Sequence, residues 1–218
     1  MYLPHHFRED RLEAQHDFIR ARPLGTLVTN GPRGLDASLV PFIVDAAASP
    51  LGTLRAHLAR ANPHWRIVEG AAEVLVLFQD AGTYVSPSWY ATKRATGKVV
   101  PTWNYVVVQA WGRPRVIGDA GWLRTLVGAL TERHEAGRPD AWSVNDAPPS
   151  FIEAQLKAII GIEIAVTRIE GKWKVSQNRP EADRAGVIQA LEAQGDDASR
   201  AMARWVRERG GDDPTPSR

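Results

Sequence analysis

The spacing of hydrophobic residues changes near the middle of the chain, and this change limits the possible folds more than any other feature. Before about residue 117, most apolar segments alternate with polar residues or run continuously, as they do in β-strands. After Asp119 the apolar residues recur at helical spacing, at Trp122, Leu123, Leu126, Val127 and Leu130. Strands therefore mostly precede helices, without alternating βαβ units. This order predicts an α+β domain built around a small antiparallel barrel.

Several segments have the composition of β-strands. They cover residues 24–30, 35–45, 52–58, 72–80, about 105–117 and 160–177. The Gly-Pro-Arg-Gly sequence at 31–34 predicts a turn that joins the first two strands into a hairpin. Residues 72–80 are apolar on both faces, which is typical of a central strand. The Glu170–Gly171 step inside the last segment predicts a turn or a bulge.

Helices are predicted near both ends of the chain and in its second half. They cover residues 8–21, 62–69, a segment from 119, a short segment from 150, and residues 181–194 and 198–209. Asn62 and Asp119 are suited to cap helices, and Pro63 favours the first helical position. We expect residues 1–209 to form a single domain, and the small, polar residues 210–218 to be a disordered tail.

The charge and the cysteine content exclude several classes of protein. The chain has 27 Lys and Arg against 25 Asp and Glu, and its net charge of +2 is too small to indicate nucleic-acid binding by itself. It has no cysteine, which excludes disulfides and thiolate chemistry and fits a reducing cytoplasm. The charged N-terminal sequence has no apolar signal segment, and no apolar run is long enough to span a membrane. We therefore expect a cytoplasmic protein without a membrane segment.

The common motifs for nucleotides, hydrolases and metals are missing from the sequence. It contains neither the GxGxxG motif, nor a Walker phosphate loop, nor a GxSxG nucleophile motif. The six histidines have no metal-binding spacing, so we expect no metal site. No helix-turn-helix is evident, and the arginine-rich segment 199–209 is typical of a solvated terminal helix. DNA binding thus has no recognisable motif to support it.

The segment HLARANPHW, at residues 57–65, combines basic side chains with the start of a helix. We expect His57 at the end of a strand, Arg60 in the following loop and Asn62 before a short helix. Cations near the free backbone N–H groups of a helix start attract anions. The segment therefore predicts an anion site. The alternative is that Asn62 only caps the helix and that Arg60 is solvated.

Two other segments mix polar and aromatic side chains. Residues 86–105, SPSWYATKRATGKVVPTWNY, offer hydroxyls, ammonium groups and flat rings. Together these suit a planar, phosphorylated ligand or single-stranded nucleic acid. In residues 172–179, KWKVSQNR, strand alternation places Lys172, Lys174 and Ser176 on one face. The alternatives are an exposed loop for the first segment and an ordinary edge strand for the second.

The order of these motifs resembles that of one family. MYLPHHF at the start, LVPF at 39–42, HLARANPHW, YVSPSWY, VVPTWNY and GKWKVSQNR are similar to motifs of the PaiB family, across about residues 1–190. Members of that family are described as FMN-binding negative transcriptional regulators. The resemblance implies a six-stranded Greek-key barrel of the FMN-binding split-barrel type, with flanking and C-terminal helices. It also implies a homodimer that holds flavin in the cleft between its subunits.

The resemblance further implies which residues contact FMN. Those nearest the phosphate are His57, Arg60 and Asn62, and those along the isoalloxazine are Ser38 and Val40. The remaining contacts come from the second half of the motif set. Lys93, Thr102 and Trp103 close over the ring, whereas Lys174 and Gln177 approach from the partner chain. No catalytic residue is implied.

The function implied first is that of an FMN-binding, PaiB-like negative transcriptional regulator. Related split barrels include flavin reductases, pyridoxamine phosphate oxidases and haem-degrading proteins, so an FMN-dependent oxidoreductase and a haem-binding protein are the alternatives. One departure from the family pattern concerns Gln109, which stands where we expect a histidine. Any chemistry or axial ligation that needs this histidine would be absent.

Overall fold

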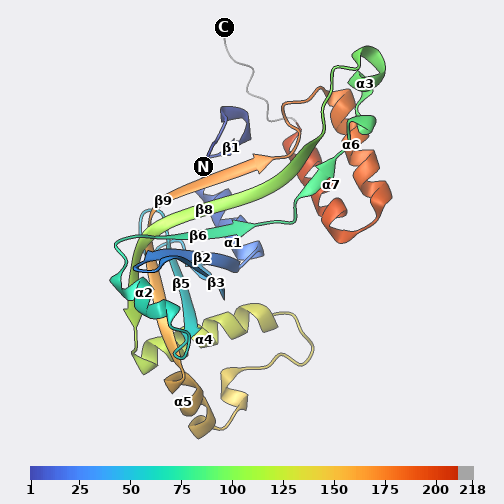
Figure 1. Cartoon of the computed structure of the whole chain (residues 1–218). Helices are drawn as coiled ribbons and strands as arrows, with labels where there is room; N and C mark the ends of the chain where they lie inside the picture. Colours follow the sequence, from blue (N-terminus) through green and yellow to red (C-terminus); the bar gives the residue numbers. More distant parts are fainter. Residues whose placement is uncertain (211–218) are drawn as a thin grey trace. The chain divides into compact units, whose positions relative to one another are not determined.

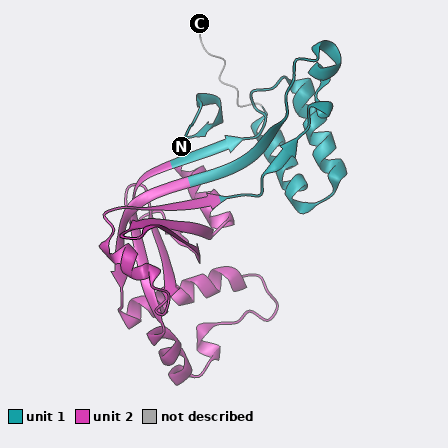
Figure 2. Ribbon diagram, in the orientation of Figure 1, with its two compact units in different colours: residues 1–11, 79–108, 170–218 teal, residues 12–78, 109–169 magenta. Residues whose placement is uncertain are grey.

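The computed structural model describes residues 1–210 of the 218-residue chain. These residues form two compact units, which Figure 2 shows in different colours. Of the described residues, unit 1 comprises 1–11, 79–108 and 170–210, and unit 2 comprises 12–78 and 109–169. The long strands β8 (Thr102–Ile117) and β9 (Ile159–Lys174) contribute residues to both units. The predicted tail at 210–218 lies, except for Gly210, outside the described residues.

Unit 2 is built on an antiparallel sheet (Figure 1). Its strands lie in the order β3-β2-β6-β8-β9-β5-β4. The strands not yet defined are β2 (Leu24–Gly31), β3 (Gly34–Pro41), β4 (Ile43–Asp45), β5 (Thr53–Ala59) and β6 (Val74–Gln79). Because β6 lies between β2 and β8, the prediction of a central strand from its two apolar faces is confirmed.

The predicted hairpin forms, with Gly31 opposite Gly34. Gly34 has a φ of +100°, in the region that favours glycine. The prediction of one strand over 35–45 is wrong, because the pairing changes at Phe42: β3 pairs with β2, whereas β4 pairs with β5. Phe42 is 1 % exposed and packs edge-on against Phe78, with their ring centroids 5.6 Å apart. Burial of this ring therefore accompanies the break between the two strands.

The helices of unit 2 are α1 (Leu12–Ala21), α2 (His64–Gly70), α4 (Ala120–Glu135) and α5 (Pro149–Lys157). α4 begins as predicted, since the Oδ1 atom of Asp119 accepts a hydrogen bond from the N–H of Trp122 at 2.7 Å. The predicted helix start at residue 8 is wrong. Arg8 and Glu9 instead form the short strand β1 (Arg8–Glu9), which pairs with Lys172 and Gly171 of β9 in unit 1.

Unit 1 combines β1, the short strand β7 (Thr83–Val85) and parts of β8 and β9 with three α-helices. These are α3 (Ala91–Thr96), α6 (Glu181–Gln194) and α7 (Asp197–Arg209). α6 and α7 pack against each other, as Figure 1 shows, and both form close to their predicted bounds. The turn predicted at Glu170–Gly171 does not form, because β9 continues through it and pairs there with β1.

The antiparallel sheet with flanking helices confirms the predicted α+β split-barrel class. The strand order contains six longer strands, as the resemblance implied, and ends with the three-residue β4. Among residues 1–210, no helix has the length and apolarity that a membrane crossing needs.

Candidate functional site

The segment HLARANPHW joins β5 to α2 in unit 2. His57 lies on β5 opposite Gly161, and Arg60 begins the loop that leads to the helix. The Oδ1 atom of Asn62 accepts a hydrogen bond from the N–H of His64 at 3.0 Å. The prediction that Asn62 caps the helix with Pro63 at its first position is nevertheless wrong, because α2 begins at His64 and its N-cap is Pro63. The indole N–H of Trp65 donates to the carbonyl oxygen of Arg60 at 2.9 Å and fixes the loop.

A histidine inside this segment connects the helix to the sheet. His64 is 1 % exposed, and its Nε2 and Nδ1 atoms lie 2.7 Å from the hydroxyl of Thr29 and 2.8 Å from that of Ser38. The amide of Asn62 also donates to Ser38 at 3.4 Å. Burial lowers the pKa of His64, although the charge of Asp36 opposes the shift. The predicted residues Ser38 and Asn62 are thus brought together around a neutral imidazole.

The two other predicted residues of this segment, His57 and Arg60, have different surroundings from those of Ser38 and Asn62. His57 is half-buried, and its Nδ1 atom has no hydrogen-bond partner among the described residues. Burial lowers the pKa of His57, which favours the neutral ring. Arg60 is exposed, and its Nε atom donates to the carbonyl oxygen of Lys157 at 3.1 Å. This single bond leaves the terminal nitrogens of Arg60 available to a ligand.

Arg60 lines a cavity of about 580 Å³ in unit 2. Its other lining residues are Gly118, Ala120, Leu123, Glu153, Leu156 and Lys157. Two cations and one carboxylate therefore face the same space. A phosphate group with two negative charges fits this donor set, because both cations can approach it and the guanidinium can bind it through two N–H groups.

The residues predicted to lie along the ring occupy β3. Ser38 and Val40 share one face of the strand, since side chains alternate along it. Val40 is 1 % exposed and belongs to the hydrophobic core. Gln109, where a histidine was expected, is a half-buried residue of β8 in unit 2.

In unit 1, Lys174 brings two of the predicted residues together. Its Nζ atom donates to the hydroxyl of Thr102 and to the carbonyl oxygen of Trp103, both at 2.5 Å. The side chains of Thr102 and Trp103 nevertheless project from opposite faces of β8. The Trp103 ring meets Tyr84 of β7 edge-on, with the centroids 6.0 Å apart. One ligand on the inner face of β8 can therefore touch the Thr102 side chain but not the Trp103 ring.

The last two predicted residues make local contacts. Lys93 is exposed on α3 and donates to the hydroxyl of Ser88 at 3.0 Å. Gln177 is 5 % exposed; its amide nitrogen donates to the carbonyl oxygen of Trp173 at 2.5 Å, and its amide oxygen accepts from the N–H of Val175 at 2.8 Å. Both polar atoms of Gln177 thus bind the backbone at the end of β9 and just after it.

A second, smaller cavity of about 140 Å³ lies next to Lys174 in unit 1. Its lining residues are Phe7, Tyr90, Thr102, Asn104, Lys174, Ser176, Asn178 and Arg179. Tyr90, Asn104, Ser176 and Arg179 were missing from the predicted contact residues, although all four lie within the motifs SPSWY, TWNY and KWKVSQNR. Membership of these motifs was the available signal, but only the fold shows that the segments 86–105 and 172–179 line one space.

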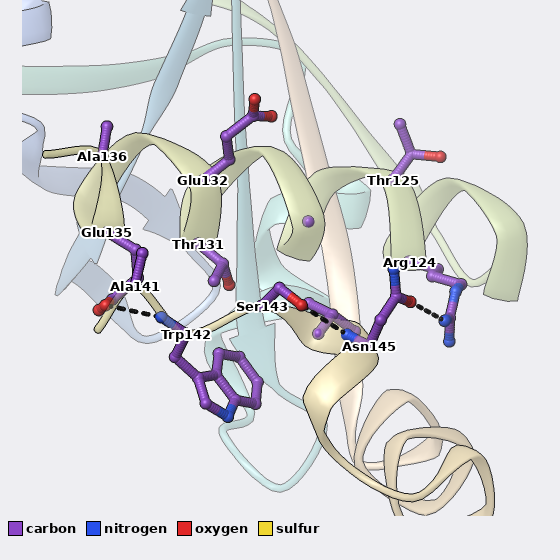
Figure 3. Close-up of a pocket in the computed structure, with 12 residues that line it drawn as sticks. Arg124, Thr125, Thr131, Glu132, Glu135, Ala136, Ala141, Trp142, Ser143 and Asn145 are labelled. Atoms are coloured by element: carbon purple, nitrogen blue, oxygen red, sulfur yellow. Dashed lines mark hydrogen bonds between the residues drawn. The ribbon is translucent and has the colours of Figure 1, made fainter. Parts of the chain in front are cut away.

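The largest of the cavities described here, about 770 Å³, lies between α4 and residues 141–145 of unit 2. Figure 3 shows that much of its polar lining is already engaged: Arg124 donates to Asn145 at 3.0 Å, and a carboxylate oxygen of Glu135 accepts from the N–H of Trp142 at 3.1 Å. These pairs leave few polar groups there to orient a ligand. Separately, no group of three or more potential metal ligands occurs in the part of the chain that the structure describes.

Comparison with known proteins gives a consistent family. Residues 1–168 match the model of a family described as "Putative FMN-binding domain". The chain is 37 % identical to an uncharacterized protein of Emericella nidulans, over 96 % of this chain and 98 % of that protein. It is 30 % identical to the protease synthase and sporulation protein PAI 2 of Bacillus subtilis, again over 96 % of this chain and 98 % of that protein.

Among solved structures, the fold is similar to that of an FAD and heme binding protein from Mycobacterium smegmatis. The TM-score is 0.57 at 18 % sequence identity, and the match covers 77 % of this chain and 73 % of that chain. At this identity the likeness establishes the fold alone.

Proposed function

The chain belongs to the family of FMN-binding domains and is PaiB-like, with FMN as the cofactor of that family, and from this premise we propose that it is a flavin-dependent regulatory protein. The observation that carries the proposal is the cavity of unit 2 in which Arg60 and Lys157 face one space. These two residues would hold the flavin phosphate. When bound, FMN supplies redox chemistry, and the protein orients its ring.

The other predicted contacts belong to the same proposal. His57 and Asn62 stand on either side of Arg60 in the sequence, and Ser38 is positioned by His64. Val40 supports the strand that carries Ser38. The contacts proposed from unit 1 are those of Lys93, Thr102, Trp103, Lys174 and Gln177.

Visible absorption of the purified protein tests the proposal directly. After addition of FMN and removal of the excess, flavin bands should remain with the protein. Arg60→Ala should weaken FMN binding by about tenfold to a hundredfold, because a charge-assisted bond to the phosphate is lost. Arg113, an exposed arginine of β8 in the same unit, provides the matched control Arg113→Ala.

Riboflavin, which lacks the phosphate, makes this test specific. Its affinity should be the same for Arg60→Ala and for the unsubstituted protein. An Arg60→Ala variant that binds FMN with unchanged affinity would remove the phosphate assignment. A protein that retains no flavin at micromolar FMN would remove the cofactor proposal, and a haem titration would then test the haem-binding alternative.

The regulatory part of the proposal does not require a DNA-reading helix. On the basic helix α7, Arg200 pairs with Asp197, Arg207 with Glu192, and Arg209 with Glu9. Three of its arginines are therefore already engaged within the chain. Direct operator binding would weaken steeply with salt in a mobility-shift titration; the proposal expects no such specific complex.

The proposed assembly is a cytoplasmic homodimer, as in the split-barrel arrangement where both subunits border the flavin. Light scattering coupled to gel filtration should give twice the mass of the chain. A monomer that still binds FMN would refute this part of the proposal.

An FMN-dependent oxidoreductase is the second candidate, and the cavity of unit 1 favours it. This cavity combines a lysine, an arginine and a tyrosine, groups that can bind or protonate a small substrate. Bleaching of bound flavin by NADH or NADPH would support the enzyme. No bleaching by either nucleotide would exclude the reductase version.

A further inference from the structure

Three cations gather around the small cavity of unit 1 without an acidic partner. Lys174 and Arg179 line it, and Lys172 lies two residues before Lys174 on the same face of β9. Lys172 is 7 % exposed. Within residues 1–210, none of the three forms an ion pair with a carboxylate. The lysines of β9 are therefore not those of an ordinary, solvated edge strand. β9 lies inside the strand order of the sheet, and Lys172 is buried.

Burying a positive charge without an ionic partner costs free energy. The other contacts of these cations therefore show how the protein offsets that cost. The Nζ atom of Lys172 donates to the carbonyl oxygen of Tyr2 at 3.0 Å and lies 5.3 Å from the ring centroid of Tyr105. Burial lowers the pKa of Lys174, and the charges of Lys172 and Arg179 lower it further. These contacts of Lys172 and Lys174 are thus to neutral oxygens and rings, and the carboxylate that acts on Tyr90 in the cavity lining is the buried Asp183.

Lys174 and Arg179 both retain donors for a ligand. An ammonium group has three N–H bonds, and Lys174 uses two of them on Thr102 and Trp103. The guanidinium carbon of Arg179 lies 4.8 Å from the ring centroid of Tyr90. A stacked guanidinium keeps its N–H groups in the plane of the group, where an anion can accept two of them.

Tyr90 provides an independent sign of a missing ligand. The residue is 0 % exposed and lines the cavity, and its hydroxyl has no hydrogen-bond partner among the described residues. Buried hydroxyls are almost always paired, so an unpaired one at a cavity indicates an absent acceptor or donor. Burial raises the pKa of Tyr90, while the charge of Arg179 lowers it and that of Asp183 raises it. The Oδ1 atom of Asp183 accepts the N–H of Thr92 at 2.8 Å, and its Oδ2 atom has no hydrogen-bond partner among the described residues.

The backbone next to the cavity is strained. Ser176 has a φ of +67°, in the left-handed region that non-glycine residues rarely adopt. It is 4 % exposed, and its hydroxyl accepts a hydrogen bond from the amide of Asn104 at 2.9 Å. Strained residues of this kind concentrate at ligand sites, where the surrounding structure holds them in place. Asn104 and Ser176 therefore form one preorganised wall of the cavity.

We infer that this cavity is a subsite for one small anionic group, a phosphate or a carboxylate, bound by Lys174, Arg179 and the hydroxyl of Tyr90. Its volume of about 140 Å³ holds such a group, whereas drug-sized ligands need pockets of about 300 Å³ or more. A three-ring flavin does not fit within it. The anionic group belongs either to a second small molecule or to the phosphate of FMN, and the subsite does not depend on flavin binding elsewhere.

Calorimetric titration with inorganic phosphate, in a low-chloride buffer, tests the subsite on the full chain. The flavin-free protein should bind phosphate, and Lys174→Gln or Arg179→Gln should weaken binding by about tenfold or more. Arg94 is an exposed arginine of α3 in the same unit, so Arg94→Gln is the matched control and should bind as the unsubstituted protein does.

Tyr90→Phe protects the test against variants that fail to fold. It removes only the unpaired hydroxyl and should weaken phosphate binding by about threefold to tenfold, whereas Tyr84→Phe, at a 46 % exposed tyrosine of the same unit, should have no effect. The inference is overturned if neither phosphate nor acetate binds to the unsubstituted protein. It is equally overturned if folded Tyr90→Phe and Lys174→Gln bind phosphate unchanged.

Repeating the titration with FMN-saturated protein separates the two sources of the anion. Phosphate that binds in the presence of FMN identifies a second ligand. Phosphate that competes with FMN identifies the flavin's own phosphate, and this result would refute the proposal that Arg60 and Lys157 hold it. Both results support the subsite. Flavin retention is measured separately by visible absorption, so a protein that binds phosphate but no FMN would refute the cofactor proposal and leave the subsite intact.

Discussion

Two buried polar clusters in this protein are composed of similar groups but differ in how those groups are paired. In unit 2, both ring nitrogens of His64 meet a hydroxyl, one of Thr29 and one of Ser38. In unit 1, the hydroxyl of Tyr90 has no partner among the described residues, and Lys174 binds only uncharged oxygens of the protein. The first cluster is complete within the chain, and the second is not.

This difference separates a structural role from a binding role. In a buried network that satisfies itself, the central group stabilises one arrangement of the backbone and has no donor or acceptor left for a ligand, as both ring nitrogens of His64 are used. A buried cluster with unpaired donors is less stable alone and gains when a ligand supplies the acceptors. Substitutions in the complete cluster should therefore cost stability, whereas those in the incomplete cluster should cost binding.

The largest expected effect follows from removing the centre of the complete cluster. His64→Ala leaves the buried hydroxyl of Thr29 unpaired, removes one partner of the Ser38 hydroxyl and creates a cavity, so the free energy of unfolding should fall by about 4 kcal/mol. Urea denaturation measures this value. His134→Ala, at an exposed histidine on α4 of the same unit, is the control and should change stability by less than about 0.5 kcal/mol.

The same histidine gives the complete cluster a pH dependence. Burial lowers the pKa of His64 in the folded state below its ordinary 6.5, with Asp36 opposing, so the unfolded chain takes up the proton first. Stability should therefore decline as the pH falls below 6.5, and this decline should be smaller in His64→Ala. An equal decline in both proteins would show that His64 is not held neutral.

The second prediction concerns Glu9, a buried carboxylate of unit 1. Both of its oxygens accept hydrogen bonds from Arg11, so it belongs with the paired groups and not with Tyr90. Burial alone would raise its pKa, but hydrogen bonds from Arg11 and Arg209 and the charge of Arg209 outweigh it and lower the pKa to about 2. The stability that this carboxylate contributes is present above pH 4.5 and is lost as the pH falls toward 2. Acid titration should show a loss of about 2 kcal/mol over that window.

Glu9→Gln provides the comparison for this titration. Because the amide does not titrate, the variant should start less stable at neutral pH and lose less stability between pH 4.5 and 2. Glu13→Gln, at an exposed acidic residue of α1, should titrate like the unsubstituted protein.

Much of the fold could be predicted because its determinants are local. Alternating apolar residues define β5, a continuous apolar run defines β6, and Asp119 defines the start of α4. The errors occurred where tertiary pairing overrides local preference. Residues 8 and 9 read as the start of a helix, but β1 pairs with β9, and the same pairing carries β9 straight through Gly171. Local pattern contains no information about these long-range partners.

The candidate site likewise has a part that could be predicted from local sequence and a part that could not. A contact of Asn62 with the start of the helix was predictable from its position before Pro63, and it forms with the N–H of His64, but the N-cap of α2 is Pro63 and not Asn62. The unit 1 cavity was not predictable from spacing, because Arg179 is distant in the sequence from the segment that contains Tyr90 and Asn104. Nothing in the sequence states whether a buried polar group has a partner. That property depends on the assembled fold, and it distinguishes the two clusters.

The third prediction concerns the strained wall of the incomplete cluster. Ser176→Gly and Ser176→Ala both remove the hydroxyl that meets Asn104, but only glycine adopts a φ of +67° without strain. Ser176→Gly should therefore be more stable than Ser176→Ala by about 1 kcal/mol in urea denaturation. Equal stability of the two variants would mean that the left-handed conformation is not maintained in solution.

The smallest expected effect on stability is also the sharpest comparison with His64→Ala. Tyr90 is as buried as His64, yet Tyr90→Phe breaks no hydrogen bond in the ligand-free protein, because its hydroxyl has no partner among residues 1–210. The free energy of unfolding should change by less than about 0.5 kcal/mol, or should increase, since an unpaired buried hydroxyl is itself unfavourable. Saturating phosphate should then stabilise the unsubstituted protein more than Tyr90→Phe, because only the tyrosine offers its hydroxyl to the anion. A loss above about 1 kcal/mol without ligand would show that the hydroxyl is paired in solution, and the distinction between the two clusters would fail.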